Sequence, residues 1–229
     1  MNIKKIICYI IAFLFIAFPC FSLDSAIKNR AFNTPKNVSQ NKYSLTHYLT
    51  KPYNDDYEKL KVIAYWISSH IAYDEYKYNN GVVNYKELNY KYDILKRRAG
   101  ICGDFAGLFT DMARVAGVSR VKVVSGYVLK NQVSIKRKYR QRDVIGAIGH
   151  AWNEVQIDGR KFYVDTTFMA RNTVTPQRRV TSLNHKFALN KNGRQNNVNE
   201  NINDFFFDFT PKSEIKKHNM VHLQDKFIK

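Results

Sequence analysis

The stretch AGICGDFAGLFTDMARVAG, at residues 99–117, has the spacing of an amphipathic helix. Gly100 and Gly103 interrupt the chain where the pattern begins, and Gly117 stands where a helix commonly ends on a left-handed residue. The sequence therefore predicts a helix whose first turn contains Cys102. Its apolar residues recur at intervals of three and four, which places them on one helix face: Phe105, Leu108, Phe109, Met112, Val115 and Ala116.

A cysteine at a helix N-terminus lies beside backbone N–H groups that lack a partner within the helix, and beside the positive end of the dipole. Both features favour thiolate over thiol, and the same N–H groups can stabilise an oxyanion that forms when the sulfur attacks a carbonyl. A lone helical cysteine is more often a small buried apolar residue. Cys102 and the N–H of Gly103 are therefore candidates for a nucleophile and an oxyanion donor, and the partners of Cys102 decide between the two readings.

Two strand-like segments on either side of Asp158-Gly159 predict a β-hairpin downstream of this helix. The first segment is HAWNEVQI at residues 150–157, and the second is RKFYVDT at residues 160–166. An Asp-Gly pair between two such segments favours a two-residue type I′ turn, which pairs Ile157 with Arg160.

The predicted register places His150 near Asp165. Extending the pairing sets Trp152 opposite Asp165 and His150 opposite Thr167, so His150 and Asp165 are diagonal neighbours on one face, about 7–8 Å apart at the backbone. Asp165 can then accept the Nδ1–H of His150, fix the ring tautomer and leave the other nitrogen for Cys102. A bulge would shift the register and remove this argument. An isolated His/Asp pair is more often an ordinary contact.

At these residues the chain resembles the transglutaminase-like superfamily of papain-type cysteine enzymes, and most closely its kyphoscoliosis-peptidase-like branch. The resemblance implies a triad with Cys102 as nucleophile, His150 as base and Asp165 as the residue that orients the base, and it implies no cofactor. Phe168 and Met220 depart from the family, which often has tryptophan and proline there. The matching segments are AYWISSHIAYD (64–74), AGICGDFAGLFTDMARVAGV (99–118), VVSGYV (123–128), GHAWNEVQIDGRKFYVDTTF (149–168) and NDFFF (203–207).

We expect an α+β fold of the transglutaminase-like or papain-like type, with the nucleophile helix packed on an antiparallel sheet. Asp55 and Glu58 fit the start of a preceding helix. Its apolar stripe should pack against the Cys102 helix; the stripe comprises Leu60, Ile63, Ala64, Ile67 and Ile71. Tyr73 follows that helix and can assist an oxyanion hole, although plain packing is the commoner role. Residues 120–129 and 204–209 predict strands of the sheet.

Residues 1–22 read as a secretory signal peptide. Lys4 and Lys5 precede an apolar run over residues 6–18, and Ser22 can occupy the cleavage site. The run is shorter than the roughly 20 residues that span a bilayer, so cleavage after Ser22 is expected over an uncleaved anchor. The mature chain should then contain no transmembrane segment, and it should be secreted or periplasmic.

The remaining chain divides into a polar N-terminal arm over residues 23–53 and a transglutaminase-like domain over residues 54–229. The arm is rich in Asn, Ser, Thr and Lys, and predicts at most a short helix at residues 44–49. Of the three cysteines, two lie in the predicted signal, so Cys102 would be the single thiol of an exported protein. Catalysis gives a reason to keep an unpaired thiol in an oxidising compartment.

The chain carries a formal net charge of +18, part of which lies in a polar loop ahead of His150. The basic residues of this loop are Lys136, Arg137, Lys138, Arg140 and Arg142. A charge run is usually a solvated loop. The alternative is attraction for an anionic protein or cell-envelope surface, whereas nucleic acid is disfavoured because no nucleic-acid-binding motif accompanies the charge. His218 and His222 lack a third ligand in sequence, so no metal site is predicted.

These features predict an exported cysteine enzyme that acts on amide bonds of a protein or peptide substrate. The Cys102 thiolate attacks the carbonyl, His150 protonates the leaving amine, and the thioester passes to water or to a second amine. Water makes the enzyme a peptidase or amidase, and an amine makes it a transglutaminase. The alternative is a non-catalytic basic binding module with the same fold that engages an anionic surface, and the intact Cys/His/Asp set argues against it.

Overall fold

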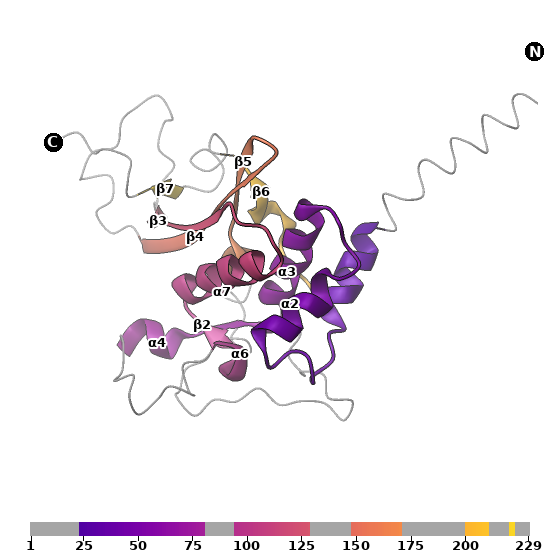
Figure 1. Cartoon of the computed structure of the whole chain (residues 1–229). Coiled ribbons are helices and arrows are strands. Elements are labelled where there is room, and N and C mark those ends of the chain that lie inside the picture. The colour runs from indigo at the N-terminus through magenta and orange to yellow at the C-terminus, as the bar shows by residue number, and fades with distance from the viewer. Residues whose placement is uncertain (1–22, 81–93, 129–147, 171–199, 211–219, 223–229) are drawn as a thin grey trace, which may run out of the picture.

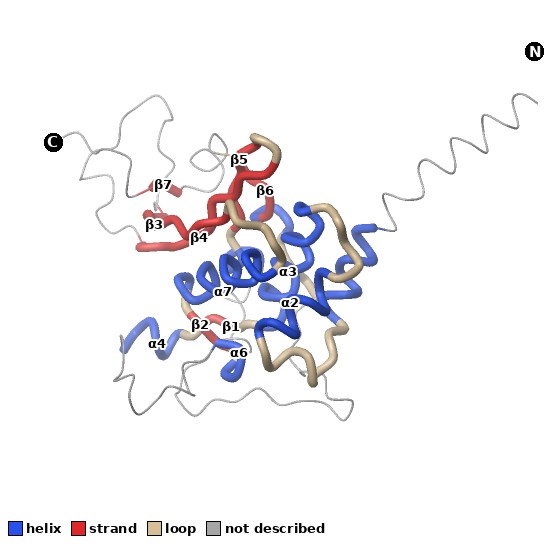
Figure 2. Tube along the Cα trace, viewed as in Figure 1, coloured by secondary structure: helices blue, strands red, loops and turns tan. Residues whose placement is uncertain are grey.

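The computed structural model describes residues 23–80, 94–128, 148–170, 200–210 and 220–222 of the chain. Within these residues, most helices gather on one side of a five-stranded antiparallel sheet (Figure 1, Figure 2). This arrangement confirms the predicted α+β class. No helix in the described segments has both the length and the apolar character needed to cross a bilayer.

Most helices lie in the N-terminal half, and the strands of the five-stranded sheet follow them in the chain. The helices are residues 23–32, α2 (Lys42–Thr50), α3 (Asp56–His70), α4 (Glu75–Asn80), α6 (Ile94–Arg97), α7 (Cys102–Val115), α8 (Thr166–Met169) and the 3₁₀ helix η3 (Asp204–Phe206). The strands are β1 (Ala72–Tyr73), β2 (Ala99–Gly100), β3 (Val121–Val128), β4 (Ile148–Ile157), β5 (Arg160–Val164), β6 (Phe207–Phe209) and β7 (Met220–His222).

Helix α7 begins at Cys102, as its sequence predicts. Gly117 has φ +89° and ends the helix, and the N–H of the following Val118 donates to the carbonyl of Ala113 at 2.9 Å. A left-handed residue in this place is characteristic of a helix C-terminus. The inward face of α7 is buried, whereas Val115 in the last turn is 37% exposed. The glycines therefore predicted the limits of this helix, and the spacing of apolar residues predicted its buried face except at Val115.

Helix α3 packs against α7, as its apolar stripe predicts. The Asp55 side chain accepts the N–H of Glu58 at 3.0 Å and so forms the N-cap. All five stripe residues are fully buried, and so are the aromatic residues Tyr65 and Trp66 of the same helix. This burial makes α3 the main support beneath the helix that carries Cys102.

The prediction of a polar arm over residues 23–53 is wrong. Residues 23–32 and α2 are helical, and their apolar side chains belong to the main core, including Ile27, Ala31, Leu45 and Leu49. Each helix places its apolar residues four positions apart, so they share one face. The overall composition of residues 23–53 hides this pattern, because polar residues outnumber the apolar ones in the segment.

The sheet has the strand order β6-β5-β4-β3-β7. Asp158 and Gly159 have φ values of 49° and 77°, as a type I′ turn requires, and Ile157 pairs with Arg160 as predicted. The strand predicted at residues 204–209 is shorter than expected. Its first three residues form η3, because the Asn203 side chain accepts the N–H of Phe205 and starts a helical turn.

Candidate active site

Cys102 is the first residue of α7 and is the free thiol of the described chain. It is half-buried, and the next residue, Gly103, is exposed. A Cβ added to Gly103 would meet nothing within 4 Å, so the space beside the first turn is open. Because the first N–H groups of a helix have no acceptor within it, the N–H of Gly103 is available to a ligand at the sulfur. The first turn of α7 can therefore hold an anionic atom next to Cys102.

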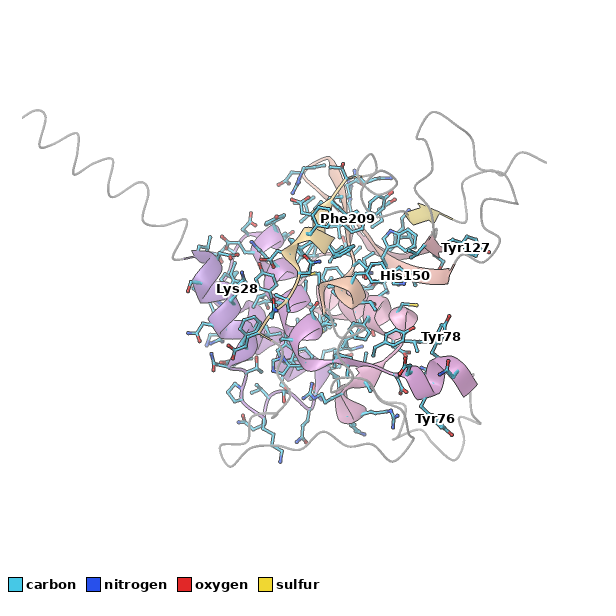
Figure 3. The ribbon with its side chains drawn as sticks, turned by 180° about the vertical axis from the view of Figure 1, so that it is seen from behind. Lys28, Tyr76, Tyr78, Tyr127, His150 and Phe209 are labelled. Atoms are coloured by element: carbon cyan, nitrogen blue, oxygen red, sulfur yellow. The ribbon has the colours of Figure 1, made fainter. Side chains whose placement is uncertain are left out.

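His150 and Asp165 form a short, buried hydrogen bond. The distance from His150 Nε2 to Asp165 Oδ2 is 2.6 Å, and the two side chains are 5% and 1% exposed. The ring nitrogen differs from the predicted one, since Asp165 binds Nε2 and leaves Nδ1 for Cys102. Figure 3 shows His150 on the side of the molecule where Tyr78 and Tyr127 also lie.

Asp165 contacts Nε2 of His150 rather than Nδ1 because the hydrogen-bonded pairing of β4 with β5 ends one residue before Asp165. The last pair is Asn153 with Val164, so the predicted pairs that involve Asp165 and Thr167 do not form. Asp165 instead caps α8, where its Oδ1 accepts the N–H groups of Thr167 and Phe168, both at 3.0 Å. Its carboxylate thus approaches the imidazole from the start of a helix rather than from across a ladder.

The charge state of His150 follows from these contacts. Burial lowers its pKa, but the charge and hydrogen bond of Asp165, together with the hydrogen bond and charge of Cys102, outweigh burial and raise the pKa to about 10. The ring is stacked on Phe168 at a centroid distance of 4.4 Å and on Trp152 at 5.8 Å. His150 is therefore an imidazolium at neutral pH, held by its carboxylate partner and by aromatic rings.

Tyr73, the candidate oxyanion donor at the end of β1, lies within electrostatic reach of Cys102. Burial raises the pKa of its hydroxyl, and the negative charge of Cys102 raises it further. The hydroxyl therefore keeps its proton at neutral pH and remains a hydrogen-bond donor. Its ring lies 6.1 Å from that of Tyr78 in α4. The structure thus brings Tyr73 to the site, although sequence reasoning favoured a packing role.

A buried asparagine joins the strand of His150 to the helix of Cys102. Asn153 Nδ2 donates to the carbonyl of Ala106 at 3.0 Å and to Thr110 Oγ1 at 2.8 Å. Sequence reasoning missed Asn153. The available signal was a polar residue at a strand position whose same-face neighbour, Val155, is apolar and fully buried. Asn153 therefore sets the position of β4 against α7.

Replacing Asn153 with alanine should destabilise the protein by about 2–3 kcal/mol, because two buried hydrogen bonds and part of the packing are lost. Urea unfolding of the variant measures this. Gln156→Ala on the same strand is the control and should change stability by less than about 0.5 kcal/mol. A loss of less than about 0.5 kcal/mol for Asn153→Ala would show that this contact does not hold β4 on α7.

The remaining predicted residues lie outside the described residues. They are the five basic residues Lys136, Arg137, Lys138, Arg140 and Arg142, and the predicted signal at residues 1–22. Within the described residues, no three His, Cys, Asp or Glu side chains are grouped to hold a metal ion.

Comparison with known proteins identifies the family. The model of the transglutaminase-like superfamily matches residues 43–166. Kyphoscoliosis peptidase of Mus musculus is 33% identical over 135 residues, which cover 58% of this chain and 19% of that protein. The Homo sapiens protein of the same name is 32% identical over 117 residues, covering 49% and 16%. The chain thus spans less than a fifth of the length of these relatives.

Among solved structures, the crystal structure of a TGase is 18% identical with a TM-score of 0.35, covering 62% of this chain and 32% of that one. The relatives confirm the resemblance that the sequence motifs indicate, including the kyphoscoliosis-peptidase-like branch. Since the family model matches more than half of its 229 residues, this chain belongs to the transglutaminase-like superfamily.

Proposed function

We propose that this chain is an exported cysteine acyl-transfer enzyme that cleaves amide bonds in proteins or peptides through a thioester on Cys102. The observation that supports it best is the buried His150–Asp165 hydrogen bond, whose imidazole also interacts with Cys102. A strongly shifted histidine beside a half-buried thiol at a helix N-terminus is typical of a reactive site. Export rests on the composition of residues 1–22.

The imidazolium of His150 stabilises the Cys102 thiolate as an ion pair. The thiolate attacks the amide carbonyl, a C–S bond forms, and the carbonyl oxygen becomes an oxyanion beside the N–H of Gly103 and the hydroxyl of Tyr73. The C–N bond then breaks as His150 Nδ1 gives its proton to the leaving amine. The product of this half-reaction is a thioester on Cys102 and a neutral imidazole.

The second half-reaction returns the enzyme to its starting state. Neutral His150 takes a proton from water, the resulting hydroxide attacks the thioester, and the C–S bond breaks to release the acid and the thiolate. An amine in place of water would give transamidation. We favour hydrolysis, because the curated relatives are named as peptidases.

Alkylation of the mature protein with iodoacetamide between pH 5 and 8 tests this function. An ordinary thiol, with a pKa of about 8.5, is only about 0.1% thiolate at pH 5.5 and loses reactivity about tenfold per pH unit. The Cys102 thiolate should instead react at a nearly constant rate across this range. Labelling that follows the rate of free cysteine would favour the non-catalytic binding module.

A further inference from the structure

An ion pair lies at the N-terminus of α7, two residues from Cys102, and the mechanism above gives it no part. Lys77 of α4 donates to both carboxylate oxygens of Asp104, at 2.9 and 2.7 Å. The side chains of Lys77 and Asp104 are 9% and 28% exposed. This cation is largely withdrawn from water, so its charge acts mainly on groups close to it.

The carboxylate of Asp104 is fixed by the start of the helix. Its Oδ2 accepts the N–H of Ile101 at 2.9 Å, which caps the first turn. The side chain also rests against Gly100, where an added Cβ would lie 2.7 Å from the Cβ of Asp104. Any residue larger than glycine would displace Asp104 from this position. Asp104 is therefore held next to Cys102 regardless of Lys77.

The backbone of Lys77 is held by Asp74, which also forms a second buried ion pair with Arg97. Its backbone N–H donates to Asp74 Oδ1 at 2.9 Å, and Asp74 Oδ2 accepts from Arg97 Nε at 2.8 Å. The N–H of Asp74 in turn donates to the carbonyl of Gly100 at 2.9 Å. These contacts bind α4 to the segment that leads into α7. The backbone of Lys77 is therefore fixed beside the start of α7, within reach of Asp104.

A negative charge in the first turn of a helix offsets the positive end of the dipole, which is the feature that favours a thiolate at the same place. Asp104 therefore opposes ionisation of Cys102 unless its charge is neutralised. We propose that Lys77 is a positioning residue that neutralises Asp104, so that the Cys102 thiolate forms beside a capped helix. The role of Lys77 in turnover rests on the proposed function, whereas its effect on thiol ionisation does not.

Other ionisable groups also surround Cys102. His150 faces it from β4, Tyr73 from β1, and Glu75 and Tyr78 of α4 lie near Tyr73. None of them is altered in the variants below. Differences among those variants therefore report the charge of Lys77 and Asp104 alone.

The test is the pH midpoint of Cys102 alkylation in Lys77→Met, Asp104→Asn and the double variant. Lys77→Met leaves Asp104 unopposed and should raise the midpoint by about half a pH unit. Asp104→Asn keeps an oxygen for the N–H of Ile101, removes the negative charge and should lower the midpoint by a similar amount. The double variant should return close to wild type, and Lys77→Arg should match wild type.

Lys42→Met is the matched control. It breaks the 2.6 Å ion pair between Lys42 of α2 and Asp111, which lies on α7 as Asp104 does. Asp111 is nine residues beyond Cys102, about 14 Å along the axis, which exceeds the screening length of about 10 Å at 0.1 M salt. This variant should leave the midpoint unchanged.

Shifts of the same sign for Lys77→Met and Asp104→Asn, or no shift in either, would overturn the proposal and leave the pair a purely structural role. If Lys77→Met fails to fold, as a thermal melt would show, the direction of the Asp104→Asn shift still decides. The variants are compared by alkylation over a range extended below pH 5, which needs no turnover. A wild-type profile that follows free cysteine would contradict the proposed function, and the signs of the variant shifts would still decide the role of Lys77.

Discussion

Cys102→Ala should reduce hydrolysis of a chromogenic peptide amide to the rate without enzyme, while thermal stability stays close to wild type. The sulfur is the atom that forms the thioester, so the methyl group of alanine leaves no route through a covalent intermediate. Mass spectrometry should find an acylated protein after rapid quenching of the wild type and none in the variant. Turnover of Cys102→Ala above background would mean that another group is the nucleophile.

His150→Ala should reduce peptide hydrolysis at neutral pH nearly as much as Cys102→Ala does. It removes both the imidazolium that stabilises the thiolate and the proton donor for the leaving amine. Since the pKa of His150 is raised to about 10, its charged form predominates below that pH, and wild-type reactivity should persist into acidic solution. The variant should react with iodoacetamide only near the ordinary thiol pKa of about 8.5. His47→Ala, on the exposed face of α2, is the control and should match wild type.

The parts of the site that could be predicted from sequence are those fixed by local signals. The three- and four-residue spacing gave the helix of Cys102, and Asp158-Gly159 gave the hairpin that carries His150. These signals act over a few residues, so neighbouring elements do not change them. They predicted correctly that His150 and Asp165 lie close together, although the strand pairs from which this was argued do not form.

The parts that could not be predicted depend on where elements stop and on distant partners. The choice of ring nitrogen depends on β5 ending at Val164, so that Asp165 caps α8 instead of extending the ladder. The ion pair between Lys77 and Asp104 joins residues 27 positions apart through the short helix α4. No periodicity marks such a pair, because its energy comes from a contact that exists only after α4 and α7 have packed.

Asp165 has two functions in the structure, and each uses a different oxygen. Oδ2 accepts from His150 Nε2, whereas Oδ1 accepts from the N–H groups of Thr167 and Phe168. The two backbone N–H groups can bind only an acceptor. In Asp165→Asn the amide oxygen must therefore occupy the Oδ1 position, which places the NH₂ group opposite His150.

This orientation makes Asp165→Asn more harmful to activity than Asp165→Ala. The NH₂ group donates to Nε2 and forces the neutral tautomer with its proton on Nδ1, which cannot accept a proton from Cys102. We expect kcat/KM to fall about 10²–10⁴-fold, in line with the value of a general base and with the effect of a wrong tautomer in serine proteases. Asp165→Ala leaves Nδ1 able to accept, so its loss should be about tenfold smaller.

Stability should follow the opposite order. Both variants lose the buried pair with His150 and should be less stable than wild type. Asparagine still caps α8 as well as aspartate does, so Asp165→Ala should be less stable than Asp165→Asn by a further amount of about 0.5–2 kcal/mol. Measuring kcat/KM and urea unfolding for both variants separates the two functions of Asp165, because activity should fall from wild type to alanine to asparagine while stability falls from wild type to asparagine to alanine. A nearly active Asp165→Asn would mean that Asp165 only caps α8 and that His150 ionises without it. Equal large losses of activity in the two variants would contradict the tautomer argument.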